Sequence, residues 1–484
     1  MSFIVTEIRQ NLFSVLESLL ARRDEFLKNP SSDFTRKKKI SFAQTMLFPM
    51  IAGADNVATE LLDMFGENEL PLPSAMIQRR NQVKKEAFQE LFYMFNKSIP
   101  MSKTFHGYQL IACDGTRLNL PYNPSDKSTL VDNIEGRKPF NQVHLNALYD
   151  IMNDMFLDVE VQGMHEMDEN SAFCRFLDKY SKSDRKVIYI ADRGYGSLNN
   201  YAHALHNNQL FLIRMKESNA KSLCPDRPHL LDNEFVDEKV TVHVGRRRRK
   251  GNSKYENYHH VKVYHRYDFI ACGTDDIDSL CFRVLKFPLS SGKFEYIATN
   301  LPKEVFSLKV IKTLYNLRWG EETAFRHLKY AGNMVHIHSI KPDFLIQEIY
   351  GKLTLYNFSS CITKTVTRKN ALNSRRPLMT VCLPFSKIEF LTVNPRTGYI
   401  LFGFIMVIII YCYQDLCYLN DIGTGLMVHF ILKSLFPTLS QIRNMRQRIL
   451  KKYKALWLCF SLQLQFLSIL QSSLPYLNDG FIFI

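Results

Sequence analysis

The residues best suited to chemistry lie in one short stretch, residues 314–330, with the sequence LYNLRWGEETAFRHLKY. Its polar side chains repeat at steps of three, four and seven residues, at Tyr315, Arg318, Glu322 and Lys329. Because an α-helix turns by about 100° per residue, these steps place all four on one stripe of a helix. A carboxylate set among two cations and a phenol has a composition suited to holding a metal ion against a phosphate group. The structural alternative is an exposed helix with ion pairs at four-residue spacing.

Apolar residues beside this stripe indicate how its helix is oriented. They fall on an adjacent arc that can face a hydrophobic core, so the stripe is expected along the edge of the buried face. The members of this arc are Val310, Leu314, Leu317, Ala324 and Leu328.

Two aspartates upstream each follow an apolar strand. Asp114 comes after residues 110–113, and Asp192 comes after residues 187–191. Carboxylates at strand ends point into the crevice where α/β sheets place their sites, although a turn or a helix cap is the plainer role. Together with Glu322 they offer three hard oxygen donors, which match Mg²⁺ or Mn²⁺ better than zinc or copper.

The elements that must position these residues occupy residues 105–217. Alternating and β-branched runs predict a three-stranded meander, with the first strand ending near Asp114, and then a helix, a strand, a helix and a strand. Because the uninterrupted apolar run 187–191 needs burial on both faces, a mixed α/β sheet with helices on both sides is expected. The meander strands are YQLIACDGTRLNL, NQVHLNALYDI and MFLDVEVQG.

Residues 218–299 break this rhythm with strand-like runs, which predict a β-rich insertion before the glutamate helix. Within it, Arg246–Lys250 form a run of five cations near Tyr255 and Tyr258. Cations interleaved with aromatic residues can follow a phosphate backbone and stack on an unpaired base, and a solvated hairpin tip is the alternative.

The chain as a whole is basic and long enough for several domains. It has 484 residues, a formal net charge of +15 and a pI near 9.2, so nucleic acid is the expected partner and an anionic membrane surface the competing one. Its ten cysteines include no C-x-x-C pair, and the start lacks the layout of a secretory signal. An intracellular, cytoplasmic protein is therefore expected.

Residues 1–104 show helical spacing without a strand signal, which predicts a helical domain. A helix starting at Pro73 carries Arg79, Arg80, Lys84 and Lys85. Such a basic face could grip DNA, and a solvated helix face is the alternative.

In these motifs the sequence resembles the DDE transposases of bacterial insertion sequences, in particular the insertion sequence 4 family. The most specific match is the tyrosine, arginine, glutamate, lysine signature with intervals of two, three and six residues, met by the four residues of the stripe. Asp114 in ACDGT and Asp192 in ADRGYGS are similar to the two aspartate motifs, and Trp319 after Arg318 also fits.

The resemblance implies a ribonuclease-H-like core that cleaves transposon ends and transfers the strands. Asp114, Asp192 and Glu322 would hold two Mg²⁺ or Mn²⁺ ions. The partners would be double-stranded DNA, at the transposon ends and the target, and a second copy of the chain in a synaptic complex, with no membrane partner and a nucleoid location. The expected DNA contacts are Tyr315, Arg318, Lys329, Arg193, Tyr195 and Trp319.

The chain also departs from the family pattern. Glu321 stands where the family usually has an apolar residue, the insertion contains no tryptophan, and the apolar run 399–413 has no counterpart. A nuclease that does not join strands and an inactive DNA-binding relic are therefore alternatives, and a membrane-anchored protein is a distant third. The expected divisions are a helical DNA-binding domain (1–104), the core in two parts (105–217 and 300–375), the insertion (218–299) and an atypical tail (376–484), for which a frameshift is one hypothesis.

Overall fold

The computed structural model describes residues 2–367, apart from 37, 68, 133, 135, 137, 224–233, 249–254, 256, 290 and 331. These residues all belong to one compact unit. The hypotheses on the tail, and the last two cations of the run 246–250, lie outside the described residues.

Six helices precede the first strand, as the helical spacing predicted. Ser41 starts the third with a capping box, in which its hydroxyl accepts from the Gln44 N–H and the Gln44 side chain accepts from the Ser41 N–H. The helix expected to start at Pro73 and to carry Lys84 and Lys85 ends at Gln82, and the next helix begins after these lysines. The helices are α1 (Ser2–Ala21), α2 (Arg23–Phe26), α3 (Phe42–Ile51), α4 (Val57–Phe65), α5 (Pro73–Gln82) and α6 (Glu86–Ser98).

Two arginines of the expected basic face of α5 are buried, so that part of the prediction was wrong. The Arg79 guanidinium lies 4.2 Å from the ring of Phe34. Arg80 forms an ion pair of 3.1 Å with Glu348 and joins α5 to α12 (Pro342–Thr367). Arg79 therefore packs against the segment between α2 and α3, Arg80 joins two helices, and neither buried charge forms a DNA-reading surface.

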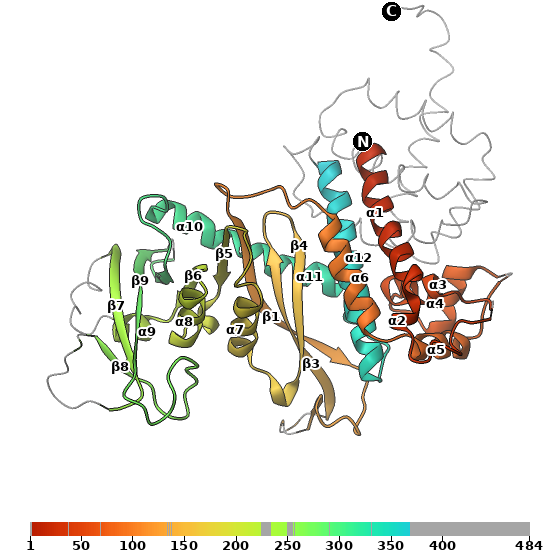
Figure 1. The fold of residues 1–484 in the computed structure, drawn as a ribbon, viewed down its shortest axis with the longest axis horizontal. Helices are drawn as coiled ribbons and strands as arrows, with labels where there is room; N and C mark the ends of the chain where they lie inside the picture. The colour runs from red at the N-terminus through yellow and green to blue at the C-terminus, as the bar shows by residue number, and fades with distance from the viewer. Residues whose placement is uncertain are drawn as a thin grey trace, which may run out of the picture. The chain divides into compact units, whose positions relative to one another are not determined.

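A single mixed sheet of ten strands follows these helices (Figure 1). Its order is β2-β3-β1-β5-β6-β10-β9-β7-β8, with β4 also paired to β3. The predicted meander β1-β3-β4 is antiparallel, and β1, β5 and β6 are parallel, which gives the ribonuclease-H-like arrangement expected. The strands are β1 (Gln109–Leu120), β2 (Leu130–Val131), β3 (Phe140–Asp150), β4 (Met155–Gly163), β5 (Val187–Ala191), β6 (Leu210–Met215), β7 (Val236–Gly245), β8 (Tyr258–His260), β9 (Ile277–Pro288) and β10 (Phe294–Thr299).

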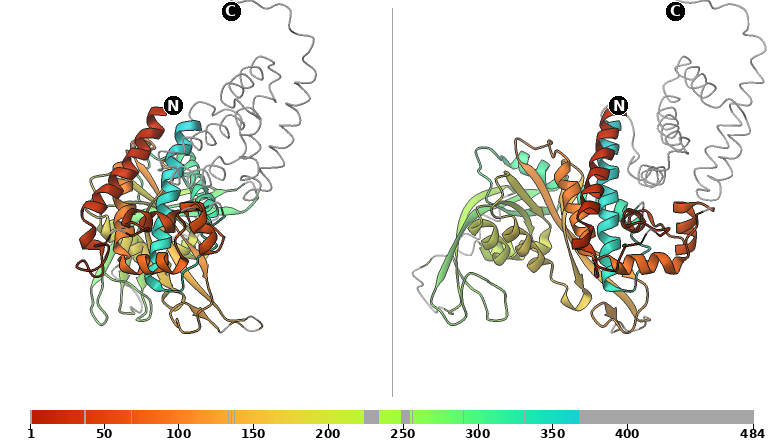
Figure 2. Two further views of the ribbon diagram at one scale, coloured as in Figure 1. Left: turned by 90° about the vertical axis from the view of Figure 1, so that its right-hand side faces the viewer. Right: turned by 45° about the vertical axis from the view of Figure 1, so that its right-hand side comes forward.

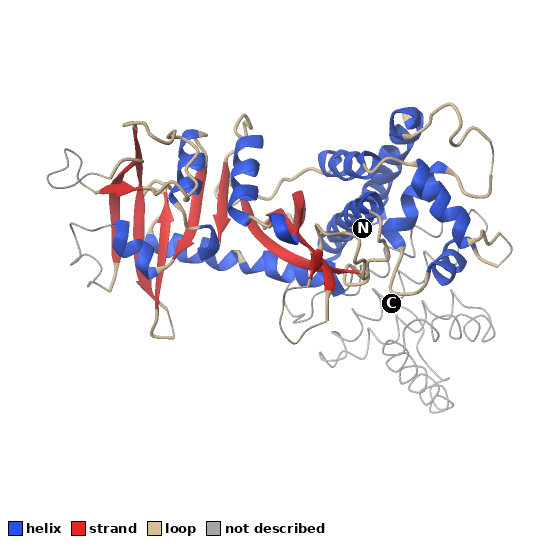
Figure 3. Ribbon diagram, turned by 90° about the horizontal axis from the view of Figure 1, so that it is seen from below, coloured by secondary structure: helices blue, strands red, loops and turns tan. Residues whose placement is uncertain are grey.

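Helices cover both faces of this sheet (Figure 3). On one face α7 (Glu169–Lys179) and α8 (Leu198–His206) bury the apolar side chains of β1, β5 and β6. On the other face lie α10 (Leu308–Leu317), α11 (Trp319–Tyr330) and α12. In turn α12 packs along α1 and α6, which joins the N-terminal helices to the core (Figure 2). Short helices complete the fold: η1 (Met164–Glu166), η2 (Arg193–Tyr195) and α9 (Glu217–Leu223).

The β-rich insertion extends the main sheet, because β9 pairs with β10 and β10 pairs with β6. One strand predicted there is mostly a loop: β8 ends at His260, and residues 261–276 have no strand pairing. The Arg246 guanidinium explains this, because it donates to four backbone carbonyls of the loop and satisfies them without a neighbouring strand. In residues 2–367, outside the gaps, no helix is long and apolar enough to cross a membrane.

Candidate active site

The register of two parallel strands makes Asp114 and Asp192 neighbours. Cys113 of β1 pairs with Ala191 of β5, and each aspartate is the next residue in its strand direction. The sequence had suggested that the first strand ends near Asp114, and this prediction was wrong. It continues to Leu120 because its ladder with β3 persists, while β5 stops at Ala191.

Tyr315 and Arg318 connect the glutamate helix to both aspartates. The Tyr315 hydroxyl donates to Asp192 Oδ1 over 3.1 Å. The Arg318 guanidinium is 2.8 Å from Glu322 Oε1 and 3.8 Å from Asp114 Oδ2, and its side chain is only 3% exposed. Two acids thus contact one buried cation, and the third, Asp192, lies near enough to interact with it electrostatically.

The expected single helix is divided at Arg318 into α10 and α11. The Arg318 N–H donates to the Tyr315 carbonyl and the Glu321 N–H donates to the Arg318 carbonyl, both over three residues. Such bonds tighten the turn toward 3₁₀ geometry. The backbone continues in a right-handed helical conformation, so Tyr315 and Glu322 still face the same site.

Asp192 is held ionised by its surroundings. Burial would raise its pKa, but the Arg193 backbone N–H, the Arg318 charge and the Tyr315 hydroxyl outweigh that effect and lower it. Arg214 of β6 also contributes, 3.5 Å from Asp192 Oδ1, and makes a close ion pair with Glu295. The sequence analysis missed Arg214, although a lone cation within the apolar run LFLIRM was a usable signal.

Asp114 is in the opposite situation. Burial, followed by the nearby charges of Glu169 and Glu322, raises its pKa to about 6 against the opposing Gly115 N–H and Arg318. Burial of the carboxyl group is the largest of these effects. Carboxylate oxygens fit the preference of Mg²⁺ or Mn²⁺, and Asp114, Asp192 and Glu322 are the residues that could hold such ions.

Glu321 is fully buried, in keeping with its predicted position among core-facing leucines. Neither carboxyl oxygen makes a hydrogen bond of ordinary geometry. Burial and the neighbouring Asp114 raise its pKa well above the usual range. This direction favours the neutral acid, which costs less than a carboxylate to bury at an apolar position.

The remaining candidates are distributed around the acids. Trp319 is 57% exposed, and the Arg318 guanidinium lies 5.3 Å from its ring. Arg193 is exposed, and Lys329 is partly buried, which lowers its pKa. Tyr195, expected beside DNA, is buried, with its ring edge-on to Phe173.

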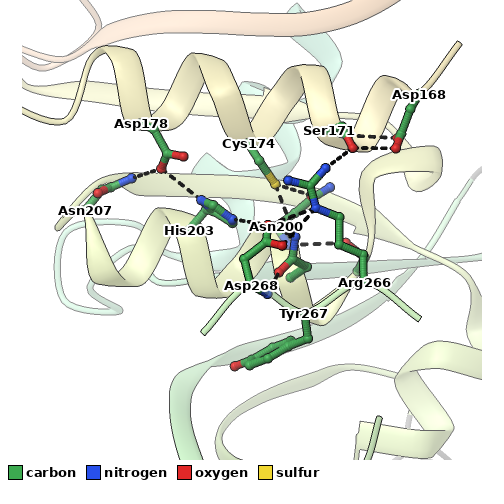
Figure 4. Close-up of polar contacts among 12 residues, drawn as sticks. Asp168, Ser171, Cys174, Asp178, Asn200, His203, Asn207, Arg266, Tyr267 and Asp268 are labelled. Atoms are coloured by element: carbon green, nitrogen blue, oxygen red, sulfur yellow. Dashed lines mark hydrogen bonds and ion pairs between the residues drawn. The ribbon is translucent and has the colours of Figure 1, made fainter. Parts of the chain in front are cut away.

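A second polar cluster lies between α7, α8 and the loop 261–276 (Figure 4). Potential metal-ligating atoms of Cys174, His203 and Asp268 all lie within 4.8 Å of one another. His203 faces Asp178 Oδ1 through Nδ1 at 2.8 Å and Asp268 Oδ2 through Nε2 at 3.0 Å. No periodicity in the sequence signalled this group.

Protein donors already satisfy this cluster. Asp268 Oδ2 accepts hydrogen bonds from Arg266 Nε at 2.9 Å and from Asn199 Nδ2 at 3.1 Å, and it also contacts His203. Burial would raise the pKa of Asp268, but these hydrogen bonds outweigh that effect and lower it to about 2. Burial raises the pKa of the Cys174 thiol to about 12, which disfavours the thiolate that a metal would need. We therefore interpret the cluster as a polar clamp between the loop and the core.

The sheet and its acids define a protein of the ribonuclease-H-like class, and sequence comparison places it more narrowly. Residues 105–358 match the transposase DDE domain family, so more than half of the chain is covered and the chain belongs to that family. No curated protein matches the chain. Among solved structures, one similar chain comes from a piggyBac transposase synaptic complex with hairpin DNA, with 10% identity, a TM-score of 0.39 and coverage of 84% of this chain and 82% of that one.

Proposed function

We propose that this chain is a DNA transposase that binds the ends of its element, cleaves them and transfers the 3′-hydroxyl ends to target DNA. The observation that carries the proposal is the convergence of Asp114, Asp192 and Glu322 on Arg318 within the matched domain. We also propose the insertion sequence 4 group and a bacterial origin, which are supported by the spacing of Tyr315, Arg318, Glu322 and Lys329.

The three acids would hold two divalent ions, Mg²⁺ or Mn²⁺. When bound, such ions polarise a phosphoryl oxygen and make water or a 3′-hydroxyl a stronger nucleophile. The protein contributes fixed geometry: the β1–β5 register sets the two aspartates, and the hydroxyl of Tyr315 orients Asp192. Because these side chains are already fixed, less conformational entropy is lost when DNA binds.

Arg318 would neutralise the phosphate next to the scissile bond. Its Nε has no hydrogen-bond partner although the atom is buried, so one donor remains for a ligand. The exposed ring of Trp319 lies beside the same guanidinium and offers a face on which an unpaired base could stack. The net charge of +15 would attract double-stranded DNA, and a second copy would bind the other end in a synaptic complex.

Purified protein would be tested on a linear DNA that carries one element end, with Mg²⁺ and a labelled 3′ strand. Asp114→Asn, Asp192→Asn and Glu322→Gln should abolish cleavage but retain end binding, while Glu321→Gln, which replaces a neutral acid, should cleave normally. Full cleavage by Glu322→Gln protein would refute the assignment. Cleavage without joined product in the presence of target DNA would identify a nuclease instead.

A further inference from the structure

Glu169 is a carboxylate near the active site that the three-acid pattern does not contain. It is the first residue of α7, and its side chain is 36% exposed. Its Oε1 lies 3.0 Å from Nε2 of His144, a β3 residue whose side chain is 3% exposed. An accessible acid therefore contacts a buried imidazole of a strand that is paired on both sides.

Two glycines show where this carboxylate lies relative to the aspartates. A Cβ atom at Gly115, directly after Asp114, would be 2.3 Å from His144 Nε2 and 2.8 Å from Glu169 Oε1. A Cβ atom at Gly194, two residues after Asp192, would be 3.9 Å from Glu169 Oε2. Glu169 thus lies over the backbone that follows Asp114 and reaches toward the loop that follows Asp192.

The polar groups around Glu169 are incompletely satisfied. His144 Nδ1 is buried and has no hydrogen-bond partner, and the Nε2 contact with Glu169 is short but poorly aligned. The carboxylates of Glu169 and Asp114 are close enough to interact electrostatically. Buried polar groups without partners beside carboxylates are typical of a site that completes its bonding with a ligand.

We propose that Glu169, positioned by His144, is a fourth carboxylate of the catalytic centre and binds the divalent ion next to Asp114. It approaches from the α7 face of the sheet, while α10 and α11 supply Tyr315, Arg318 and Glu322 from the other. The inference rests on the proposed metal-dependent function. A carboxylate held by a buried imidazole is also better oriented for a metal than a free surface glutamate.

The decisive measurement is Mn²⁺ affinity of the full-length protein, followed by the electron paramagnetic resonance signal of free Mn²⁺. Glu169→Gln should weaken binding by about tenfold, and His144→Gln by a smaller factor, as expected for loss of a ligand and of its support. Asp114→Asn is the positive control. Glu217→Gln is the matched negative control, because Glu217 also lies at the start of a helix but is exposed and paired with Lys221 at 2.7 Å.

A second readout separates metal binding from a folding defect. Raising the Mn²⁺ concentration should restore DNA cleavage by Glu169→Gln protein, whereas a misfolded variant would not respond and would show a lowered unfolding midpoint. If Glu169→Gln does not fold, Glu169→Asp, which keeps the charge on a shorter side chain, should show the same weakened affinity.

The outcomes distinguish this inference from the proposed function. Unchanged Mn²⁺ affinity in the glutamate-169 variants, with affinity lost in Asp114→Asn, would overturn the fourth carboxylate alone. Unchanged affinity in Asp114→Asn as well would overturn the metal-dependent function itself.

Discussion

Helix α7 borders two charged clusters whose carboxylates differ in how many protein donors they have. Around His203, both carboxylates have protein donors besides the imidazole that lies between them: Asp268 accepts from Arg266 and Asn199, and Asp178 accepts from Asn207. At the acidic centre, Asp114 accepts one backbone N–H and lies 3.8 Å from its nearest guanidinium, while Glu321 has no hydrogen-bond partner. The comparison suggests that the first cluster stabilises the fold and that the second is built for a ligand.

The sharpest test of this difference is cleavage activity. Asp114→Asn should reduce the rate of end cleavage by at least about 100-fold, the size expected when a group that stabilises transition-state charge is lost. His203→Ala, corrected for the folded fraction, should cleave at a rate close to that of the wild type. A quantitative cleavage time course measures both. A larger loss in His203→Ala than in Asp114→Asn would reverse the interpretation of the two clusters.

Stability should respond to pH at Asp114. Its pKa is about 6 in the folded chain against an ordinary 3.8, so the folded state binds the proton more tightly, and unfolding free energy falls as the pH rises from about 4 to about 6. The shift of about two units corresponds to at most about 3 kcal/mol. Asp114→Asn should therefore be more stable than the wild type at pH 8, with the gain shrinking toward pH 4. Urea unfolding at the two pH values checks this, and an equal gain at both would contradict it.

Substitution in the polar clamp around His203 should lower the stability of the fold, whereas Asp114→Asn should raise it. His203→Ala removes the imidazole that contacts both Asp178 and Asp268, and it should lower the unfolding free energy by only about 1–2 kcal/mol, because both acids are partly exposed. His206→Ala, three residues along α8 and paired with Asp278, is the control. Its side chain is 44% exposed, so its loss should be smaller. Equal effects of the two substitutions would argue against a clamp.

The smallest expected effect concerns Glu321. Replacing it with isoleucine removes two buried oxygens without partners and should raise the unfolding free energy by about 1 kcal/mol. End cleavage should be retained, because Glu321 is not one of the acids proposed to hold the metal ions. Differential scanning calorimetry measures the first effect. Destabilisation would show that the carboxyl group has a structural role.

The sequence predicted what depends on local periodicity and strand order. It indicated the mixed sheet and the helices on both faces, because apolar runs follow simple geometric rules, and it singled out three acids that stay candidates for the site. The two aspartates then became neighbours through the parallel pairing of β1 and β5.

Contacts between distant residues could not be found in this way. Arg80 appeared to lie on a basic face because its partner, Glu348, is 268 residues away. The pairing of His144 with Glu169 and of His203 with Asp268 depends on how α7 and the loop 261–276 pack, which no repeat in the sequence encodes. The length of β1 was also misjudged, since only its pairing with β3 carries it past Asp114.

The pairing of Cys113 with Ala191 restricts where insertions and deletions can be tolerated in this chain. Side chains alternate between the faces of a strand, so one residue inserted or deleted in β1 or β5 ahead of the aspartate would turn that acid away from α10 and α11. The loop 261–276 has no such register and could gain or lose residues away from its anchoring contacts. Length variation among functional relatives should therefore concentrate in that loop and be absent from the first five residues of β1 and the whole of β5.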